Sequence, residues 1–393
     1  MSLFVATATA QLGLGIIAPI LPLYTTTFAA GGIEIGLVFA AFSIPQALLG
    51  PLVGGLSDRV GRKPLILAGL TGYALVSVLY AFAASLWQLG LFRLLQGAAA
   101  VMVTPIAQAY VGDLIPSGRE GRYMNAFYAS QFVGMGFGPL LGGVLGATYS
   151  YETAFFAMGG LTVLSLVLVV LTVPNDQMTR GRRSVEPRHA VPLKTVLSND
   201  AVKSILVFFG TRGVWRQSFT TFYPLFAVAT FSATESSVGL VLSTYMFSEG
   251  LLQIPLGFLA DRYPRVRQIV VGSVLAPLLL LALPFLRPPW AAAALAVVIG
   301  AFSALGRAPL VAIRTELGRT YGMARLAGIQ GSAFAVGQMS GPIIGGVVVD
   351  GLGLGAVFPF ASLAGLAGTF FVVRWLRRWL RNDRQARRIA RLC

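Results

Sequence analysis

The stretch GGLSDRVGRKP, residues 54–64, places one acidic and three basic side chains between two long apolar runs. A related stretch, GFLADRYPRVR, occupies residues 257–267, which is 203 residues further along the chain. A chain that consists mainly of apolar runs does not in general need charged turns between them. The repetition therefore indicates that the same charged turn ends an apolar segment at two equivalent places.

The composition is that of a polytopic membrane protein. Of the 393 residues, 56% are hydrophobic and 11% are charged, whereas an average soluble domain has about 25% charged residues. Apolar runs of membrane-spanning length recur throughout, and the hydrocarbon interior requires their backbone amides to bond internally, as in helices. We expect an all-α integral membrane protein with twelve transmembrane helices, at residues 3–25, 33–55, 64–85, 87–111, 123–148, 153–173, 201–230, 236–259, 266–286, 290–314, 324–349 and 354–376.

The positive charge follows membrane topology. The formal net charge is +16, and 25 of the 30 basic residues lie in or beside the even-numbered connections and the C-terminal tail. The positive-inside rule then places both termini in the cytoplasm of a protein of the cell (inner) membrane, and nucleic acid is not needed to explain the charge. The one histidine, His189, lies in a polar linker and the one cysteine, Cys393, is the last residue. We expect no metal site and no cofactor.

Further matches recur at the same offset of 203 residues. GPLLGGV from Gly138 corresponds to GPIIGGV from Gly341, and Asp113 corresponds to Glu316. Several matches at one offset indicate a six-helix unit repeated in parallel, giving two bundles related by a pseudo-two-fold axis. The expected domains are an N-terminal bundle (1–173), a basic cytoplasmic linker (174–200), a C-terminal bundle (201–376) and a basic cytoplasmic tail (377–393).

The sequence resembles the major facilitator superfamily over essentially its whole length. GGLSDRVGRK resembles that family's signature between helices 2 and 3, and RLLQG from Arg93 is similar to its helix 4 motif. GFGPLLGG from Gly136 resembles the helix 5 motif of its proton-coupled drug antiporters, and LGLGIIAPILP from Leu12 resembles a helix 1 motif of the twelve-helix drug-export branch. In the second half Pro264 replaces a signature glycine and Ala296 stands where Arg93 would map.

The charged turns are interpreted as a cytoplasmic gate. In a state closed toward the cytoplasm, Asp58 would face the positive N-terminal end of helix 11 near Ala324, an interaction worth about 0.3–1 kcal/mol. We expect Arg62 to pair with Asp113, and Arg265 with Glu316. Alternatively, the charges only obey the positive-inside rule. The gate residues are Gly54, Asp58, Arg59, Gly61, Arg62, Lys63, Asp113, Asp261, Arg262, Arg265 and Glu316.

Two glycine stripes predict close helix packing, because glycines four residues apart leave one face of a membrane helix without side chains. A proline in each stripe favours a bend. The resemblance implies that these seams are also where the two halves rock against each other. The stripes consist of Gly134, Gly138, Pro139 and Gly142 in helix 5, and Gly337, Gly341, Pro342 and Gly345 in helix 11.

Five charged residues lie inside expected spans, where charges are costly and commonly functional. They are Arg93, Arg212, Arg216, Glu249 and Arg307. Arg216 and Glu249 lie at similar depth in the hairpin of helices 7 and 8, so an ion pair is expected, with Arg212 and Arg307 left unpaired. Either these charges line a transport cavity together with Gln11, or Arg216 and Glu249 form a static structural pair.

These features predict a secondary transporter that works by alternating access, with the proton as coupling ion and Glu249 as its carrier, because a guanidinium does not release its proton. Four arginines against one acid favour a neutral, anionic or zwitterionic amphiphile, whereas the drug-export motifs indicate proton-coupled multidrug efflux. The alternatives are a lipid or organic-anion transporter and a membrane receptor or scaffold. No HExxH or GxSxG motif occurs, so we expect no enzyme. We expect a monomer whose basic tail contacts anionic lipids.

Overall fold

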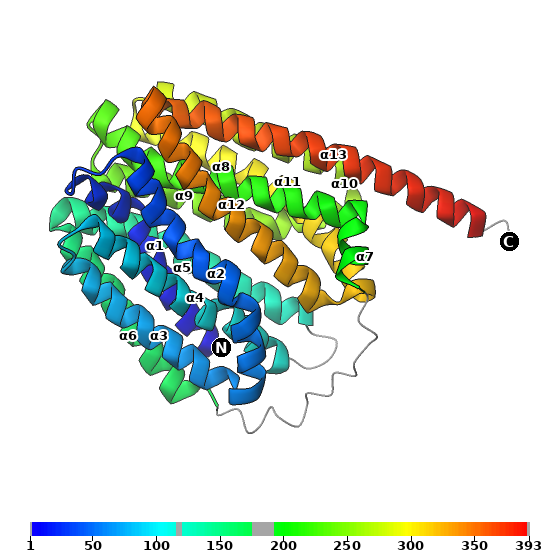
Figure 1. Ribbon diagram of the computed structural model, residues 1–393, viewed down its shortest axis with the longest axis horizontal. Helices are drawn as coiled ribbons and strands as arrows, with labels where there is room; N and C mark the ends of the chain where they lie inside the picture. The colour runs from blue at the N-terminus through cyan, green and yellow to red at the C-terminus, as the bar shows by residue number, and fades with distance from the viewer. Residues whose placement is uncertain (1, 115–119, 175–191, 391–393) are drawn as a thin grey trace.

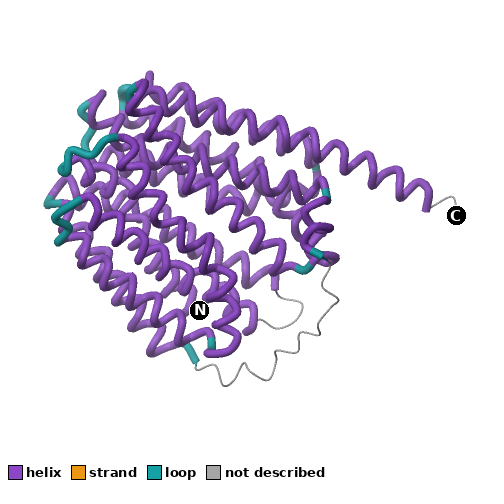
Figure 2. The backbone as a smooth tube through the Cα atoms, viewed as in Figure 1, coloured by secondary structure: helices purple, strands orange, loops and turns teal. Residues whose placement is uncertain are grey.

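The computed structural model describes residues 2–114, 120–174 and 192–390, and within these ranges the chain forms helices and short connections with no strand (Figure 2). His189, Cys393 and most of the predicted linker lie outside the described residues. The helices are α1 (Ser2–Thr26), α2 (Gly32–Val60), α3 (Arg62–Ala81), α4 (Leu86–Leu114), α5 (Glu120–Thr148), α6 (Tyr151–Thr172), α7 (Leu193–Ser198), α8 (Asp200–Phe231), α9 (Glu235–Arg262), α10 (Arg265–Leu279), η3 (Leu280–Phe285), α11 (Pro289–Tyr321), α12 (Met323–Leu352), η4 (Leu354–Ala356) and α13 (Val357–Ala390).

Eleven of the twelve expected spans each coincide with one long helix, and the span 266–286 coincides with α10 followed by η3. The helices differ in apolarity. Within the described residues, nine are long and apolar enough to cross a membrane; α5, α8 and α9 are not among them. The last two contain the internal charges Arg212, Arg216 and Glu249, which lower their mean hydropathy. The buried charges Arg93 and Arg307, in contrast, lie in α4 and α11, which are among the nine. The count of twelve spans stays a prediction.

Two expected boundaries differ from the helix limits. The end of the predicted linker contains the short helix α7, and α8 begins at Asp200 behind the capping residue Asn199, whose side-chain oxygen accepts from the backbone of Ala201. At the other end, α13 continues without a break past residue 376 and projects from the bundle (Figure 1). The expected tail is thus an extension of the last span up to Ala390.

The two halves of the chain make equivalent internal contacts. In the first half α1 packs on α5 and α6, while α4 packs on α2 and α3. In the second half α8 packs on α12 and α13, and α11 packs on α9 and α10. When the long helices are numbered one to six within each half, the contacting pairs are the same in both halves. A repeated six-helix unit requires this correspondence.

The glycine stripes pack helices of the same half together. A Cβ at Gly134, Gly138 or Gly142 would collide with the backbone of α1, and Gly337 and Gly341 meet the backbone of α8 in the same way. The expectation of close packing is confirmed. The glycines of the stripes face the first helix of their own half, whereas the stripe prolines Pro139 and Pro342 meet glycines of the other half. The expectation that the halves rock against each other at these seams stays a prediction.

Neighbouring small residues form the contacts between the halves, in the pairs α2–α12 and α5–α9. Gly36 meets the backbone of Pro342 and Gly346 meets that of Gly32, while Gly239 meets that of Pro139. All of these contacts lie toward the end of the molecule that carries the short connections, visible at the left of Figure 2. We call this the short-loop end.

The opposite end, which we call the linker end, carries the charged turns, and there α2 and α12 diverge. Gly54 lies 18 residues after Gly36, and Gly328 lies 18 residues before Gly346, so each pair is on one helix face five turns apart. A Cβ at Gly54 or Gly328 would have no atom within 4 Å. In Figure 1 the two helices start close together and run apart toward the linker end.

We predict that Gly138→Ala destabilises the fold, because the added methyl group would overlap the backbone of α1. Overpacking of this kind costs about 1–3 kcal/mol, and the apparent Tm in detergent should fall. Gly160→Ala is the matched control, since a Cβ there would have no atom within 4 Å. Equal Tm values for the two variants would contradict the assigned packing.

Candidate functional site

Glu249 is the centre of a buried charge cluster in the second half. One of its oxygens, Oε1, accepts from Arg212 Nη2 and, at 2.7 Å, from Ser303 Oγ; the other, Oε2, lies 3.4 Å from Arg216 Nε. The side chains of Arg212 and Glu249 are each 6% exposed and that of Arg216 is 11% exposed. Three helices, α8, α9 and α11, are tied together at this carboxylate.

The predicted pair between Arg216 and Glu249 is confirmed, but the prediction that Arg212 is unpaired is wrong. Arg212 and Arg216 are one turn apart on α8 and point from the same face toward α9. One carboxylate has two oxygens, so it accepts from both guanidiniums at once. The comparison of depths in the hairpin of helices 7 and 8 identified Arg216 as a partner of Glu249. It overlooked that Arg212, one turn earlier on α8, reaches the same carboxylate.

A close approach of α11 brings Ser303 to the cluster. A Cβ at Gly300 would lie 2.6 Å from the Tyr245 carbonyl oxygen and 2.9 Å from the Glu249 nitrogen, so only glycine allows this contact. Ser303, almost one turn later on α11, then reaches the carboxylate. The serine was missed because a hydroxyl in a membrane helix bonds equally well to its own backbone.

Positive charge exceeds negative charge around this site. Arg307 lies one turn beyond Ser303 on α11, and its buried Nε has no hydrogen-bond partner. It lies within electrostatic range of Arg216 and of Tyr128, which belongs to α5 in the first half. Arg307 therefore connects the cluster to the interface between the halves, and the three arginines are opposed there by one acid.

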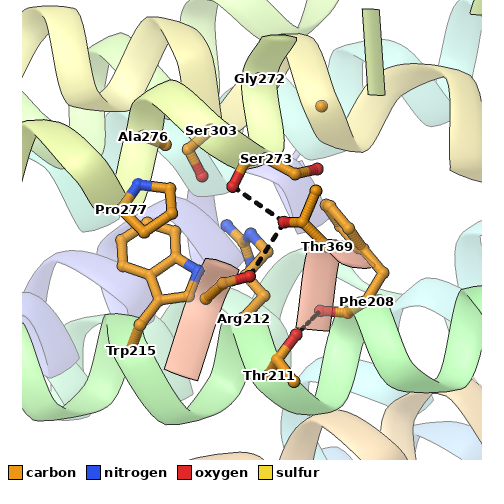
Figure 3. Close-up of a pocket in the computed structure, with 12 residues that line it drawn as sticks. Phe208, Thr211, Arg212, Trp215, Gly272, Ser273, Ala276, Pro277, Ser303 and Thr369 are labelled. Carbon is orange, nitrogen blue, oxygen red and sulfur yellow. Dashed lines mark hydrogen bonds between the residues drawn. The ribbon is translucent and has the colours of Figure 1, made fainter. Parts of the chain in front are cut away.

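A small cavity of mixed polar and apolar lining adjoins Arg212 and Ser303 (Figure 3). Its volume is about 20 Å³ and its lining includes Thr211, Ser273 and Thr369, the last of which donates to the Ser273 carbonyl at 3.0 Å. That volume holds about one water molecule. The cavity is therefore too small for an organic solute.

The structure does not bring Arg93 to the cluster around Glu249. Its Nη1 donates to Gln96 at 3.0 Å, and the guanidinium lies over the rings of Phe39 and Phe42 at 5.1 and 4.4 Å. Tyr80 donates to the same Gln96 oxygen at 2.9 Å. Among the described residues Arg93 has no ion pair, so a buried cation is held in the first half by aromatic faces and an amide.

Gln11 belongs to a pair of amides that joins α1 to α5. Its Nε2 donates to Gln131 at 3.2 Å, and in the second half Gln338 donates to Gln217 at the same distance, joining α12 to α8. The sequence prediction named Gln11 alone. The signal that could have found the others is an amide in each of the first and fifth helices of both halves.

The gate residues whose side chains are described make contacts within their own half. Arg265 and Glu316 form the predicted ion pair at 2.8 Å. Lys63 donates to the Val173 carbonyl at 2.6 Å, which binds the start of α3 to the end of α6. Gly61 joins α2 to α3 with φ 118°, a backbone conformation that favours glycine.

Three of the predicted gate carboxylates, Asp58, Asp113 and Asp261, have side chains outside the described residues. The pairing of Arg62 with Asp113 and the contact of Asp58 with the start of α12 therefore stay predictions. Arg62 Nη1 donates to Ser57 Oγ at 2.7 Å. Arg59 and Arg262 lie in the last turns of α2 and α9, as expected.

Sequence reasoning missed Asp350, which lies at the short-loop end of α12. Its two carboxylate oxygens accept from the backbone nitrogens of Gly32 at 2.6 Å and Ile33 at 2.9 Å, in the first turn of α2. An acid at a helix N-terminus is stabilised by unpaired amides and by the helix dipole. Asp350 thus fastens the two halves at the end opposite to the predicted gate.

Comparison with known proteins gives a consistent result. The sequence model described as Major Facilitator Superfamily matches residues 3–229 and, a second time, residues 204–390. The multidrug resistance protein MdtG of Enterobacter lignolyticus is 27% identical over 381 residues, covering 92% of this chain and 88% of MdtG. The quinolone resistance protein NorA of Staphylococcus aureus is 25% identical over 347 residues, covering 86% of this chain and 87% of NorA.

Among solved structures, the nucleoside transporter NupG matches with a TM-score of 0.76 at 15% identity. The match covers 96% of this chain and 98% of NupG. At this identity the likeness concerns the fold alone.

The charge cluster predicts that replacing its acid and replacing one of its arginines have unequal effects on stability. Glu249→Gln should destabilise the protein strongly, because both guanidiniums lose their counter-charge, and breaking a buried pair costs about 3–5 kcal/mol. Arg212→Met should cost less, since Arg216 still neutralises Glu249. In the Glu249→Gln background Arg212→Met should raise the apparent Tm in detergent. Additive losses in Tm would show that the three groups do not act as one cluster.

We predict that Asp350→Asn loosens the short-loop end. With Cys393→Ser in place, a cysteine introduced at Ser243, which is buried between α9 and α5, should react about two- to thirtyfold faster with an impermeant maleimide, because a charged cap contributes about 0.3–2 kcal/mol. Glu34→Gln is the control, since Glu34 caps only its own helix. Unchanged labelling in Asp350→Asn would contradict the assignment.

Proposed function

The chain belongs to the Major Facilitator Superfamily, whose members are transporters, and we propose that it moves a small amphiphilic solute out of the cell in exchange for protons by alternating access. Its relatives MdtG and NorA are named for resistance to multiple drugs and to quinolones, which supports efflux of the multidrug type. The proposal does not extend to an enzymatic reaction, since the family moves solutes rather than transforming them.

The proposed architecture is two six-helix bundles related by a pseudo-two-fold axis, with twelve spans and both termini in the cytoplasm. The double match of one family model to residues 3–229 and 204–390 supports it. So do the equivalent contacts within each half. The linker end is then cytoplasmic by the positive-inside rule, and the short-loop end faces outward.

The observation that carries alternating access is the difference between the two ends of the α2–α12 contact. Gly36 and Gly346 meet the opposite helix, whereas Gly54 and Gly328, on the same faces, meet nothing within 4 Å. An α2–α12 contact that is closed at the short-loop end and open at the linker end corresponds to an inward-open conformation. In the proposed outward-open conformation the cytoplasmic ends close, Asp58 meets the start of α12, and Asp350 releases α2.

We assign the proton to Glu249, which lies between α8, α9 and α11 and accepts from Arg212 and Ser303. When it is ionised, the carboxylate holds the two arginines of α8 in place. When it is protonated, it no longer neutralises them, and their guanidiniums become available to a solute or to water. The arginines cannot themselves carry the proton, so the exchange of proton for solute is centred on this carboxylate.

The excess of arginine bears on the solute. Arg307 and Arg93 have buried Nε atoms without a hydrogen-bond partner, and an unpaired buried donor is costly. A solute with acceptor groups would satisfy these donors, whereas a purely cationic solute would be repelled. A neutral, zwitterionic or anionic amphiphile fits best, and an organic anion or a lipid is the second candidate for the same reason.

The test is transport by purified protein in vesicles with an acidic lumen. Wild-type protein should concentrate a quinolone inside the vesicles, and a panel of cationic, anionic and zwitterionic amphiphiles should rank the cationic compounds last. Glu249→Gln should lower gradient-driven accumulation at least about tenfold, because the titrating group is gone, while exchange of labelled for unlabelled solute partly survives.

Loss of stability is separated from loss of coupling by the double variant Arg212→Met/Glu249→Gln. Its Tm should recover in part, because one of the guanidiniums that lost its counter-charge is removed, yet its gradient-driven accumulation should not recover. If either variant concentrates solute with normal pH dependence, the proton is carried elsewhere and Glu249 is a structural partner of the arginines.

A further inference from the structure

A groove lies between α10 and α13, on the outer surface of the second half. It has a volume of about 880 Å³ and is lined by one residue of α10, Val274, and by one face of α13. Phe370 and Val373 supply apolar surface to it, and Phe370 is largely exposed. Nearby, Thr369 donates to the Ser273 carbonyl at 3.0 Å, which holds the two helices together where the groove begins.

The linker end of the groove is basic. Arg374, Arg377 and Arg381 all line it, and their spacing of three and four residues puts them on one face of α13. All three side chains are exposed, and none forms an ion pair with a described residue. An apolar channel therefore ends at three guanidiniums that have no counter-charge among the side chains that the structure describes.

The opposite face of α13 is occupied by the protein. Arg378 lies 3.4 Å from Asp200 at the start of α8, and Leu376 is fully buried in the core of the second half. Trp379 packs partly against the same core. These contacts fix the rotation of α13 so that the three free arginines face the groove rather than the bundle.

A surface that faces lipid cannot leave such a groove empty, because acyl chains fill it. Tryptophan and arginine residues concentrate at the level of lipid headgroups, and Trp375 and Trp379 lie among the three arginines in the sequence. The apolar part of the groove is thus at acyl-chain depth and the arginines are at headgroup depth. Arginine binds phosphate oxygens through its planar, bidentate fork.

We propose that this groove is a binding site for one anionic phospholipid, with an acyl chain between α10 and α13 and the headgroup phosphate held by Arg374, Arg377 and Arg381. The occupant is a lipid rather than a free anion, because the groove has an apolar part that extends beyond its basic end. The site is more specific than general attraction of a basic tail to a membrane, since it depends on the three arginines that line the groove.

The test is native mass spectrometry of the purified full chain with added phosphatidylglycerol or phosphatidylcholine. Wild-type protein should retain phosphatidylglycerol at least tenfold more than phosphatidylcholine. The variant R374Q/R377Q/R381Q should lose this preference. The variant R384Q/R387Q/R388Q, which removes the same charge from the same tail beyond the groove, should stay within twofold of wild type.

Three outcomes would overturn the proposal. Equal losses in the two triple variants would mean that the tail attracts lipid through its overall charge. Equal retention of the two lipids by wild-type protein would mean that the arginines do not recognise a headgroup. Displacement of phosphatidylglycerol by an equal concentration of inorganic phosphate would mean that the apolar groove contributes nothing. Val274→Trp, which fills the groove without changing charge, should weaken phosphatidylglycerol retention, and unchanged retention would likewise contradict the site.

Discussion

Helices in hydrocarbon gain little by hiding apolar side chains from one another, so their association depends on close backbone contact and on buried polar groups. Glycine provides that contact throughout this protein. Gly138 packs α5 on α1, Gly337 packs α12 on α8, and Gly36 packs α2 on α12 across the halves. Gly300 lets α11 approach α9, and this contact brings Ser303 to Glu249. The same constraint thus builds each half, joins the halves and assembles the charge cluster.

The contacts between the halves must also be reversible in a transporter. Those between α2 and α12 are glycine against backbone at the short-loop end, together with the cap that Asp350 places on α2, and they have little side-chain interlocking to undo. Those between α5 and α9 also include aromatic side chains, since Phe247 packs against Gly136 and Phe137. The charge cluster, in contrast, lies within one half and ties three helices together. A change in the ionisation of Glu249 therefore alters the half that must move relative to its partner.

The sequence was sufficient for features that depend on periodicity. The repeat at one offset, the close packing at glycine stripes and the pairing of Arg216 with Glu249 are all consequences of helical geometry. It was insufficient for contacts that depend on how helices rotate and which neighbours they meet. The direction of the stripes toward α1 and α8, the second partner Arg212 and the cap by Asp350 have no signature in spacing, because each joins residues whose relative rotation is set by tertiary packing.

The central claim is that the two ends of the molecule open in alternation, and paired distance measurements test it directly. In a Cys393→Ser background, spin labels at Gly55 and Gly328 report the linker end, where both sites are open. Labels at Trp87 and Trp290, which are one repeat apart and exposed, report the short-loop end. The account predicts that lowering the pH changes the two distances in opposite senses, and that Glu249→Gln abolishes this response. Distances that stay fixed, or that change together, would contradict it.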